Sequence, residues 1–273
     1  MAGVTAPAGL FAADYHTHSN ISFDGHDDIP AMLRAAQAAG LREIAVTDHC
    51  DMGKPFDAGG HRAASLEARA MMETGGVRLV YGIELGEATH DPERALAITR
   101  DHPYDFVLGS YHQFKGERDF YYMTYDSAED CHALIGRYLD DLLELIDLGC
   151  FDVLGHLTYP LRYIHRVPAL SGVSFAAHPE KTQAVLRALI EAGKGIELNV
   201  SGLWRKDGQA MPDLELLKLY RSLGGEIVTA GSDAHAAADV GRGLTEGYAM
   251  LREAGFRHVA AYQERKVRFE RLD

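Results

Sequence analysis

Seven short runs of apolar residues alternate along the chain with longer segments in which apolar residues recur at helical spacing. Runs of this length and composition are typical of buried β-strands, whereas the recurring pattern is typical of amphipathic helices. The chain therefore alternates between predicted strands and predicted helices. The predicted strands are residues 10–16, 43–49, 77–85, 104–112, 151–157, 195–200 and 226–235.

Helix boundaries are marked most clearly in the first intervening segment. Pro30 stands near the first helical position after Asp28, the pattern AMLRAAQAA follows, and Gly40 lies where the helix is expected to stop. The terminal segment KVRFERLD fits either a strand or irregular structure. Further helices are predicted near residues 61–74, 91–101, 127–148, 178–192, 212–223 and 245–254.

Strands that are separated by helices are expected to be parallel, because a helix is the usual crossover between parallel neighbours. No Pro/Ser-rich linker, internal repeat or low-complexity segment divides the chain, so we expect a single domain over residues 1–273. Two α/β architectures agree with seven such repeats: a closed barrel of seven strands, or an open doubly wound sheet.

The polar residues at the strand ends favour the barrel. Only the sixth strand lacks an imidazole or carboxylate at its end, where it has Asn199 and Ser201. In a β/α barrel the carboxyl ends of all strands meet at one mouth and form the site. We therefore expect a distorted seven-stranded (β/α)7 TIM-like barrel. The residues at the other strand ends are His16, His18, Asp48, His49, Glu84, His112, His156, Asp233 and His235.

Any one of these side chains is ordinarily a polar residue that meets water, but so many together indicate a metal centre. Burying these charged side chains without a bound cation costs on the order of several kcal/mol for each charge. Imidazoles and carboxylates without thiolates suit zinc, iron or manganese. Glu84 or Asp233 is placed to bridge two ions, and Asp24 is expected to serve another. Bridged ions lower the pKa of a shared water, which is typical of a hydrolase.

Charge and cysteine content narrow the function further. The 273 residues include 40 acidic and 27 basic side chains, a formal net charge of −13, which disfavours nucleic acid as a partner. Three divalent ions would offset about six of these charges. Cys50, Cys131 and Cys150 form no Cys-x-x-Cys pair, which indicates a reducing cytoplasm. No segment is typical of a secretory signal or of a membrane span.

Six motifs, in this order over residues 14–235, resemble the PHP (polymerase and histidinol phosphatase) superfamily, and most closely its free-standing histidinol-phosphate phosphatases. The motifs are DYHTHS with SFDG, TDHCD, YGIELGE, GSYHQF, VLGHLTYP and AGSDAH. The resemblance implies a distorted seven-stranded barrel with three divalent ions (Zn, Fe or Mn). It assigns them the ligand sets His16, His18, Glu84 and Asp233; Glu84, His112 and His156; and Asp24, His49 and His235.

The same resemblance implies hydrolysis of a phosphate monoester, with L-histidinol phosphate converted to L-histidinol in histidine biosynthesis. A metal-bridging hydroxide is expected to attack phosphorus, and Asp233 or a metal-bound water to protonate the leaving group. Arg162 and Arg205 follow strand ends, and their planar forks match phosphate oxygens. The expected catalytic residues are Asp233, His235, Arg162 and Arg205. The expected substrate contacts are Arg162, Arg205, Asn199, Ser201 and Tyr122.

Three other functions remain open: hydrolysis of another small phosphate ester or nucleotide, an amidohydrolase activity, and a non-catalytic metal-binding module. The sequence does not specify the number of subunits. Asp14 and Asp48 adjoin the predicted ligands and are expected to orient imidazoles from behind. The histidines outside the motifs are expected at the surface or in loops; they include His26, His61, His165 and His178.

Overall fold

The structure, a computed structural model, describes residues 11–71, 76–205 and 208–272. The first ten residues, on which the expected absence of a secretory signal depends, lie outside this part, as do residues 72–75 at the end of one predicted helix. Among the described residues no helix is both long and apolar enough to cross a membrane.

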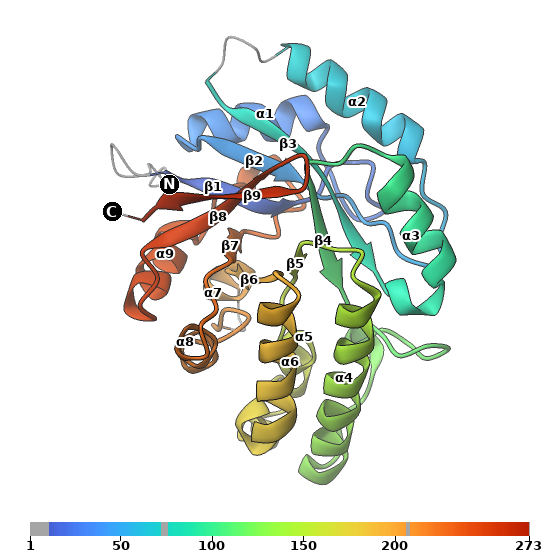
Figure 1. Ribbon diagram of the computed structural model, residues 1–273, viewed down its shortest axis with the longest axis vertical. Coiled ribbons are helices and arrows are strands. Elements are labelled where there is room, and N and C mark those ends of the chain that lie inside the picture. The colour runs from blue at the N-terminus through green and yellow to red at the C-terminus, as the bar shows by residue number, and fades with distance from the viewer. Residues whose placement is uncertain (1–10, 72–75, 206–207, 273) are drawn as a thin grey trace.

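Seven strands form one parallel sheet, and each is hydrogen-bonded to the next in chain order. The last strand returns to the first, because the Asp233 N–H donates to the His16 carbonyl at 2.9 Å and the His18 N–H to the Ala234 carbonyl at 2.8 Å. The result is a nearly closed barrel, which confirms the predicted fold over the open sheet (Figure 1). The strands are β1 (Ala13–Thr17), β2 (Glu43–Val46), β3 (Arg78–Gly86), β4 (Phe106–Ser110), β5 (Val153–Leu154), β6 (Gly195–Asn199) and β7 (Val228–Gly231).

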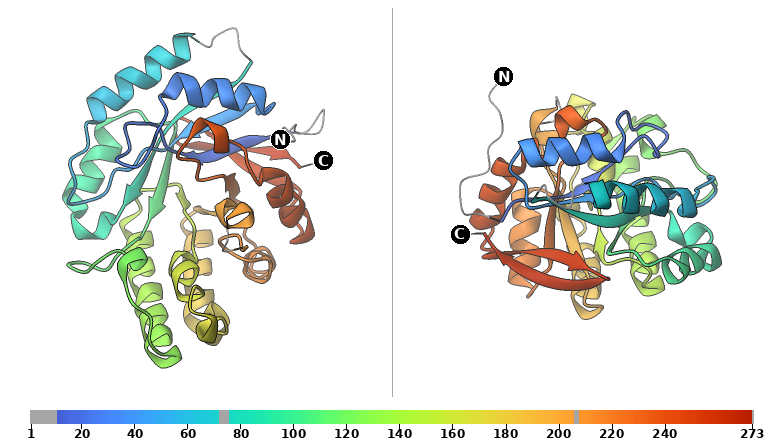
Figure 2. Two further views of the ribbon diagram at one scale, coloured as in Figure 1. Left: turned by 180° about the vertical axis from the view of Figure 1, so that it is seen from behind. Right: turned by 90° about the horizontal axis from the view of Figure 1, so that it is seen from above.

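Helices surround the strands on the outside of the barrel (Figure 2). Seven of them lie where the sequence predicts helices, and the short α5 and α7 were not predicted. Local signals set the boundaries: the Asp28 side chain accepts the Ala31 N–H at the start of α1, and Gly149 ends α4 with a φ of 76°. The helices are α1 (Ile29–Ala38), α2 (Ala58–Met71), α3 (Pro92–Asp101), α4 (Ala128–Leu148), α5 (Tyr159–Ile164), α6 (Pro179–Glu191), α7 (Ser201–Trp204), α8 (Leu214–Ser222) and α9 (Leu244–Glu253).

Two apolar layers stabilise the barrel. The larger lies between strands and helices, and the smaller fills the barrel interior. Tyr15 on β1 meets Phe106 on β4 edge to face, with ring centroids 5.2 Å apart, although these strands are not neighbours. This contact crosses the interior, so the barrel is packed rather than hollow near its amino end.

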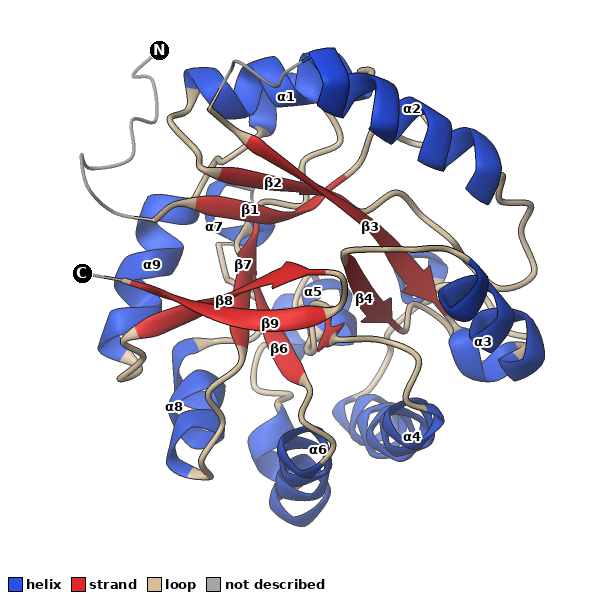
Figure 3. Cartoon of the chain, turned by 45° about the horizontal axis from the view of Figure 1, so that its top comes forward, coloured by secondary structure: helices blue, strands red, loops and turns tan. Residues whose placement is uncertain are grey.

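An antiparallel hairpin of β8 (His258–Gln263) and β9 (Lys266–Arg271) lies across the amino ends of the strands (Figure 3). The Tyr262 N–H donates to the Tyr15 hydroxyl at 2.8 Å, and the Arg265 N–H donates to the Asp105 carbonyl at 3.0 Å. Ala260 and Ala261 join the interior core. The terminal segment is thus a strand, and β8 was not predicted. The hairpin closes this end and leaves the carboxyl end of the barrel as its open mouth.

Candidate metal centre

His16 and His18 leave the end of β1 with their rings directed at each other. Their Nε2 atoms are 3.0 Å apart, and each lies 3.6 Å from Glu84 Oε2 on β3. Asp233, after β7, places Oδ1 3.8 Å from the first Nε2 and 3.6 Å from the second. All four residues are buried. Side chains that are more than 200 positions apart in the chain therefore meet at one point.

A bulge in β1 directs these two imidazoles into the barrel. The register pairs Asp14 with Ile44 and Thr17 with Val46, so β1 has one residue more than β2 over this step. In a regular strand Tyr15 and His16 would face opposite sides. The extra residue changes the alternation. Tyr15 and His16 both face inward as a result.

Hydrogen bonds behind the two rings determine which nitrogens carry protons. His16 Nδ1 lies 2.8 Å from Glu197 Oε1, so it donates to that carboxylate. His18 Nδ1 donates to Ser22 Oγ at 3.2 Å, because the Ser22 hydroxyl itself donates to Asp48 at 2.8 Å. When both rings are neutral, the two Nε2 atoms present lone pairs to each other at 3.0 Å. Two lone pairs at this distance repel. In the metal-free chain burial is outweighed by Glu197, Glu84 and Asp233, which hold the pKa of His16 well above its usual range, so a proton relieves this repulsion; a metal ion at the same place relieves it as well, and the donor set fits one.

Glu84 is shared by a second pair of imidazoles. Its Oε1 lies 2.8 Å from His156 Nε2 and 3.3 Å from His112 Nε2, and these two nitrogens are 3.4 Å apart. Its Oε2 lies 2.8 Å from His49 Nδ1, but the two atoms form no hydrogen bond, and both are buried without a partner among the described residues. A buried carboxylate oxygen without a donor is costly, and a bound cation removes that cost.

The remaining predicted ligands surround His18. Its ring stacks between those of His49 and His235, with centroid distances of 4.3 and 4.2 Å. Asp24 reaches His235 Nε2 at 3.3 Å and His49 Nε2 at 3.6 Å. Asp24 is the most exposed of these residues, with 39% of its side chain accessible.

Among the residues that the structure describes, four groups of side chains have ligand atoms within 4.8 Å of one another. One coincides with a predicted set, a second contains three of the four residues of another predicted set and lacks Asp233, and a third contains His18 where the resemblance has Asp24. The fourth was not predicted; in it Asp51 and Glu87 join His112. The groups are His16, His18 and Glu84; Glu84, His112 and His156; His18, His49 and His235; and Asp51, Glu87 and His112.

The buried charges shift one another's pKa values. Burial raises the pKa of the Glu84 carboxyl, but His49, His16 and His112 outweigh this effect and hold that pKa well below its usual range. Burial also lowers the pKa of His49, but Glu84 and Asp24 more than compensate and raise it to about 10. Burial, with His49 and His235 nearby, lowers the pKa of His18 to about 3. The Glu84 carboxyl is therefore ionised at neutral pH, and His18 is a neutral imidazole that can donate an electron pair.

Sequence reasoning missed two acids that position the imidazoles. Glu197, on β6, accepts the backbone N–H of His156 at 2.7 Å besides its bond to His16. Glu87 accepts the backbone N–H of His112 at 2.7 Å and faces its Nδ1 at 3.2 Å. A signal existed for Glu197, because it is a charged residue in the middle of the apolar run GIELNV.

The aspartates expected to orient imidazoles have different roles. Asp14 accepts hydrogen bonds from Ser232 and from the Gly241 N–H, so it joins β1 to the loop after β7 instead of holding a ring. Asp48 acts on His18 through Ser22, and its Oδ2 lies 3.2 Å from His61 Nε2. The expectation that His61 lies at the surface is wrong, because only 1% of it is exposed.

Two residues of the centre have positive φ angles, 26° for His156 and 54° for Asp233. Such conformations cost about 1–3 kcal/mol each and persist where surrounding contacts impose them. The bond from His156 to Glu197 and the bond from the Asp233 N–H to the His16 carbonyl supply those contacts. Both residues lie two positions after a strand end, where the chain must turn sharply to bring the side chain over the mouth.

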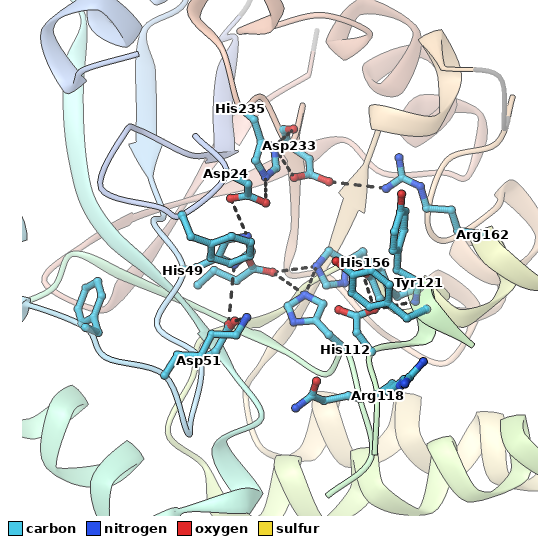
Figure 4. A pocket seen from close by; sticks show the side chains of 18 of the residues that line it. Asp24, His49, Asp51, His112, Arg118, Tyr121, His156, Arg162, Asp233 and His235 are labelled. Atoms are coloured by element: carbon cyan, nitrogen blue, oxygen red, sulfur yellow. Dashed lines mark hydrogen bonds and ion pairs between the residues drawn. The ribbon is translucent and has the colours of Figure 1, made fainter. Parts of the chain in front are cut away.

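A pocket of about 1000 Å³ opens above these groups (Figure 4). Arg162 on α5 points into it, with Nη1 3.9 Å from Asp233 Oδ2 and 7% of its side chain exposed. Arg205 also lines the pocket and is exposed, with its guanidinium 4.9 Å from the Trp204 ring. Tyr122 is part of the rim, with 67% of its surface accessible.

Asn199 and Ser201 are fully buried and lie outside the described lining of this pocket. Asn199 Oδ1 accepts hydrogen bonds from the Ser201 hydroxyl at 2.7 Å and from its N–H at 3.1 Å. The Ser201 hydroxyl also lies 3.4 Å from Asp233 Oδ2. These two residues support the loop beneath Asp233.

The other histidines outside the motifs lie apart from the centre. His26 is exposed, as expected. His165 is partly buried in the α5 loop, where it contacts the Val173 carbonyl at 2.8 Å. His178 is also partly buried and faces His132 on α4 at 3.3 Å.

Comparison with known proteins agrees with this architecture. The family described as PHP domain matches residues 14–201, and the one described as PHP-associated matches residues 226–254. A probable histidinol-phosphatase of Thermotoga maritima is 27% identical over 258 residues, which cover 90% of this chain and 94% of the relative. The histidinol-phosphatase of Lactococcus lactis is 27% identical over 267 residues, which cover 93% and 95%.

A solved structure shares the fold. It is the histidinol phosphate phosphatase of Lactococcus lactis in complex with Zn, L-histidinol and phosphate. Its TM-score is 0.82 at 24% identity, and the match covers 95% of this chain and 100% of that chain. Because the PHP domain match spans more than half of the sequence and includes the barrel from β1 to β6, this chain belongs to the PHP domain family.

Proposed function

We propose that this protein is a metal-dependent phosphatase that hydrolyses L-histidinol phosphate to L-histidinol and phosphate. The observation that carries the proposal is the pair of Nε2 lone pairs of His16 and His18, held 3.0 Å apart beside a buried carboxylate. A metal ion that replaces the proton on His16 makes that arrangement favourable. The relatives named histidinol-phosphatase support the choice of substrate.

In this proposal the three predicted ligand sets would hold divalent ions of zinc, iron or manganese. Glu84 belongs to two of these sets, as it does to two of the observed groups. Such ions, when bound, stabilise negative charge on phosphoryl oxygens and supply an activated water at neutral pH. The predicted ligands in these groups are His16, His18, Asp24, His49, Glu84, His112, His156, Asp233 and His235.

The other residues of the pocket orient the ester. Arg162 and Arg205 offer planar donor forks to the phosphoryl oxygens, and Tyr122 lies at the entrance, where the organic part is exposed. Asp233 and His235 share the rim with Arg162, where they can exchange a proton with the leaving oxygen. Asn199 and Ser201 act by holding the Asp233 loop.

Steady-state kinetics with a panel of phosphate esters tests the proposal. We expect kcat/KM for L-histidinol phosphate to exceed that for glycerol phosphate and for a nucleoside monophosphate by about tenfold or more, since the pocket must bind the correct organic group in the transition state. Equal values across the panel would contradict the substrate assignment. Turnover of amides but of no phosphate ester would contradict the phosphatase activity itself.

One observation favours a second candidate, a PHP-type phosphatase for a different phosphate ester. The pocket volume of about 1000 Å³ leaves room for an organic group larger than that of L-histidinol phosphate. A nucleotide preference in the same kinetic panel would identify this alternative. A cytoplasmic location and a small-molecule substrate remain predictions, as does the absence of nucleic-acid and membrane partners.

A further inference from the structure

Asp119 is a carboxylate of the same pocket that belongs to none of the metal-binding groups. It is partly buried and precedes the short helical turn of residues 120–122. Its Oδ1 accepts the Tyr121 N–H at 2.7 Å and faces the Tyr159 hydroxyl at 3.4 Å. Its other oxygen has no hydrogen-bond donor within the described part of the chain.

The backbone fixes Asp119 at a set position relative to the metal centre. Asp119 pairs with Gln113 in an antiparallel bridge, and the next N–H, of Phe120, donates to the His112 carbonyl at 2.9 Å. The ring of Tyr159 lies between Asp119 and the imidazoles, with centroids 5.0 Å from His112 and 4.9 Å from His156. The carboxylate therefore lies about one tyrosine ring away from the metal centre.

No cation lies within ion-pair distance of this carboxylate in the described structure, although Lys54 is near enough to interact with it electrostatically. The Lys54 ammonium, across the pocket, is 2.7 Å from Asp51, and Arg162 faces Asp233. Arg166 lies over the rings of Tyr121 and Tyr163 rather than against Asp119. A partly buried carboxylate without a direct ion-pair partner, beside aromatic rings, is a site for a cation from solution.

We propose that Asp119 binds the cationic group of the organic part of the phosphate ester, and thereby selects esters that carry an ammonium or imidazolium group. This inference rests on the proposed phosphatase function and deepens it. The two ends of the ester bind at different places in the pocket. The metal centre and the arginines attract the phosphate. Asp119, with the Tyr121 and Tyr159 rings, attracts a positive group at a distance of about one tyrosine ring from the metal centre. Asp119 adds no binding energy for esters whose organic group is neutral or acidic.

The test is the Asp119→Asn variant, assayed with the protein as purified with its metals. Asparagine keeps the oxygen that accepts the Tyr121 N–H and removes only the charge. We expect KM for L-histidinol phosphate to rise about tenfold or more, as for loss of a charged hydrogen bond, with kcat nearly unchanged. The KM for glycerol phosphate, which has no positive group, should change by less than about twofold.

A matched control is Glu117→Gln on the same loop, which removes the same charge from a side chain that pairs with Arg137 and does not line the described pocket. Its kinetic constants should equal those of the unmodified protein. Two further substrates separate the two possible cations. Phosphoethanolamine has only the ammonium group, and 2-(imidazol-4-yl)ethyl phosphate has only the ring. The substrate whose KM rises in Asp119→Asn carries the group that Asp119 binds.

A readout that needs no turnover is the Kd of L-histidinol, measured by calorimetry, which should rise by a similar factor. Equal effects of Asp119→Asn on charged and neutral esters, or no effect on either, would overturn the role of Asp119 while leaving the phosphatase proposal intact. An unmodified protein that hydrolyses no phosphate ester would contradict the proposed function instead. In that case unchanged binding of L-histidinol by the variant would also exclude Asp119 as its partner.

Discussion

Glu197 shows how one buried residue controls the donor atoms of several others. It holds His16 through a side-chain bond and His156 through a backbone bond, and it is fully buried. Its two oxygens accept both bonds, which keeps a proton on His16 Nδ1 and leaves Nε2 free to donate an electron pair. Carboxylates behind metal-ligating histidines commonly raise the affinity of the site in this way.

The Glu197→Gln variant should bind metal about 10–100-fold more weakly. A glutamine that still accepts the His156 N–H turns its own N–H₂ toward His16, which forces the His16 proton onto Nε2 and removes that lone pair. Metal content after dialysis, measured by mass spectrometry, checks the prediction. Glu226→Gln, an exposed glutamate 3.5 Å from Arg221, is the control. Equal metal retention in both variants would show that Glu197 has no such role.

At the scale of elements, the centre depends on how closely β7 approaches β1. Gly231 ends β7, and a Cβ at this position would lie 2.4 Å from His16 Cβ and 2.4 Å from Glu197 Oε1. The glycine is therefore required by the packing of three strands rather than by a turn. The bulge in β1 lies beside Gly231 along the barrel axis, and it turns the imidazoles toward this contact.

Gly231→Ala should lower the free energy of unfolding by about 1–3 kcal/mol, as overpacking does in a dense core, and should reduce metal content as well. Chemical denaturation measures the free energy of unfolding, and mass spectrometry of the dialysed protein measures its metal content. Gly172→Ala is the matched control, because no heavy atom within 4 Å would meet its Cβ. If the two variants unfold at the same denaturant concentration, the close approach of β7 to β1 is not as rigid as the structure indicates.

Several carboxylates of the chain, among them Glu84 and Asp233, are buried at the barrel mouth. The chain's net charge of −13 includes the buried carboxylates of the centre, which the neighbouring imidazoles partly neutralise when protonated. Metal ions bind the folded chain through neutral imidazoles. Binding a metal ion therefore displaces the protons that these imidazoles carry in the metal-free protein. Stability, metal affinity and pH are therefore coupled in this protein.

Removing the metal with a chelator should lower Tm by several degrees, because ions that bind only the folded state stabilise it. The loss should be larger near pH 8 than near pH 6. The folded pKa of His49 is about 10, above its unfolded value, so its contribution to the metal-free protein is complete at low pH and declines as pH rises. Metal affinity changes in the opposite direction, since its imidazole ligands must be neutral.

Differential scanning calorimetry at the two pH values, with and without chelator, measures this difference. A chelator effect that is equal at both pH values would contradict the coupling. An unchanged Tm at both would show that no stabilising ion was bound.

The sequence by itself determined the strand and helix alternation, the parallel barrel and the strand-end residues that converge at its mouth. These features are local, since hydrophobic period and punctuation depend on near neighbours, and parallel strands joined by helices must bring their carboxyl ends to one side. Only the tertiary structure decided the bulge that turns His16 inward, the roles of Glu197 and His61, the burial of Asn199 and Ser201, and the hairpin that closes the barrel. Each of these depends on contacts between residues distant in the chain, which no local pattern records.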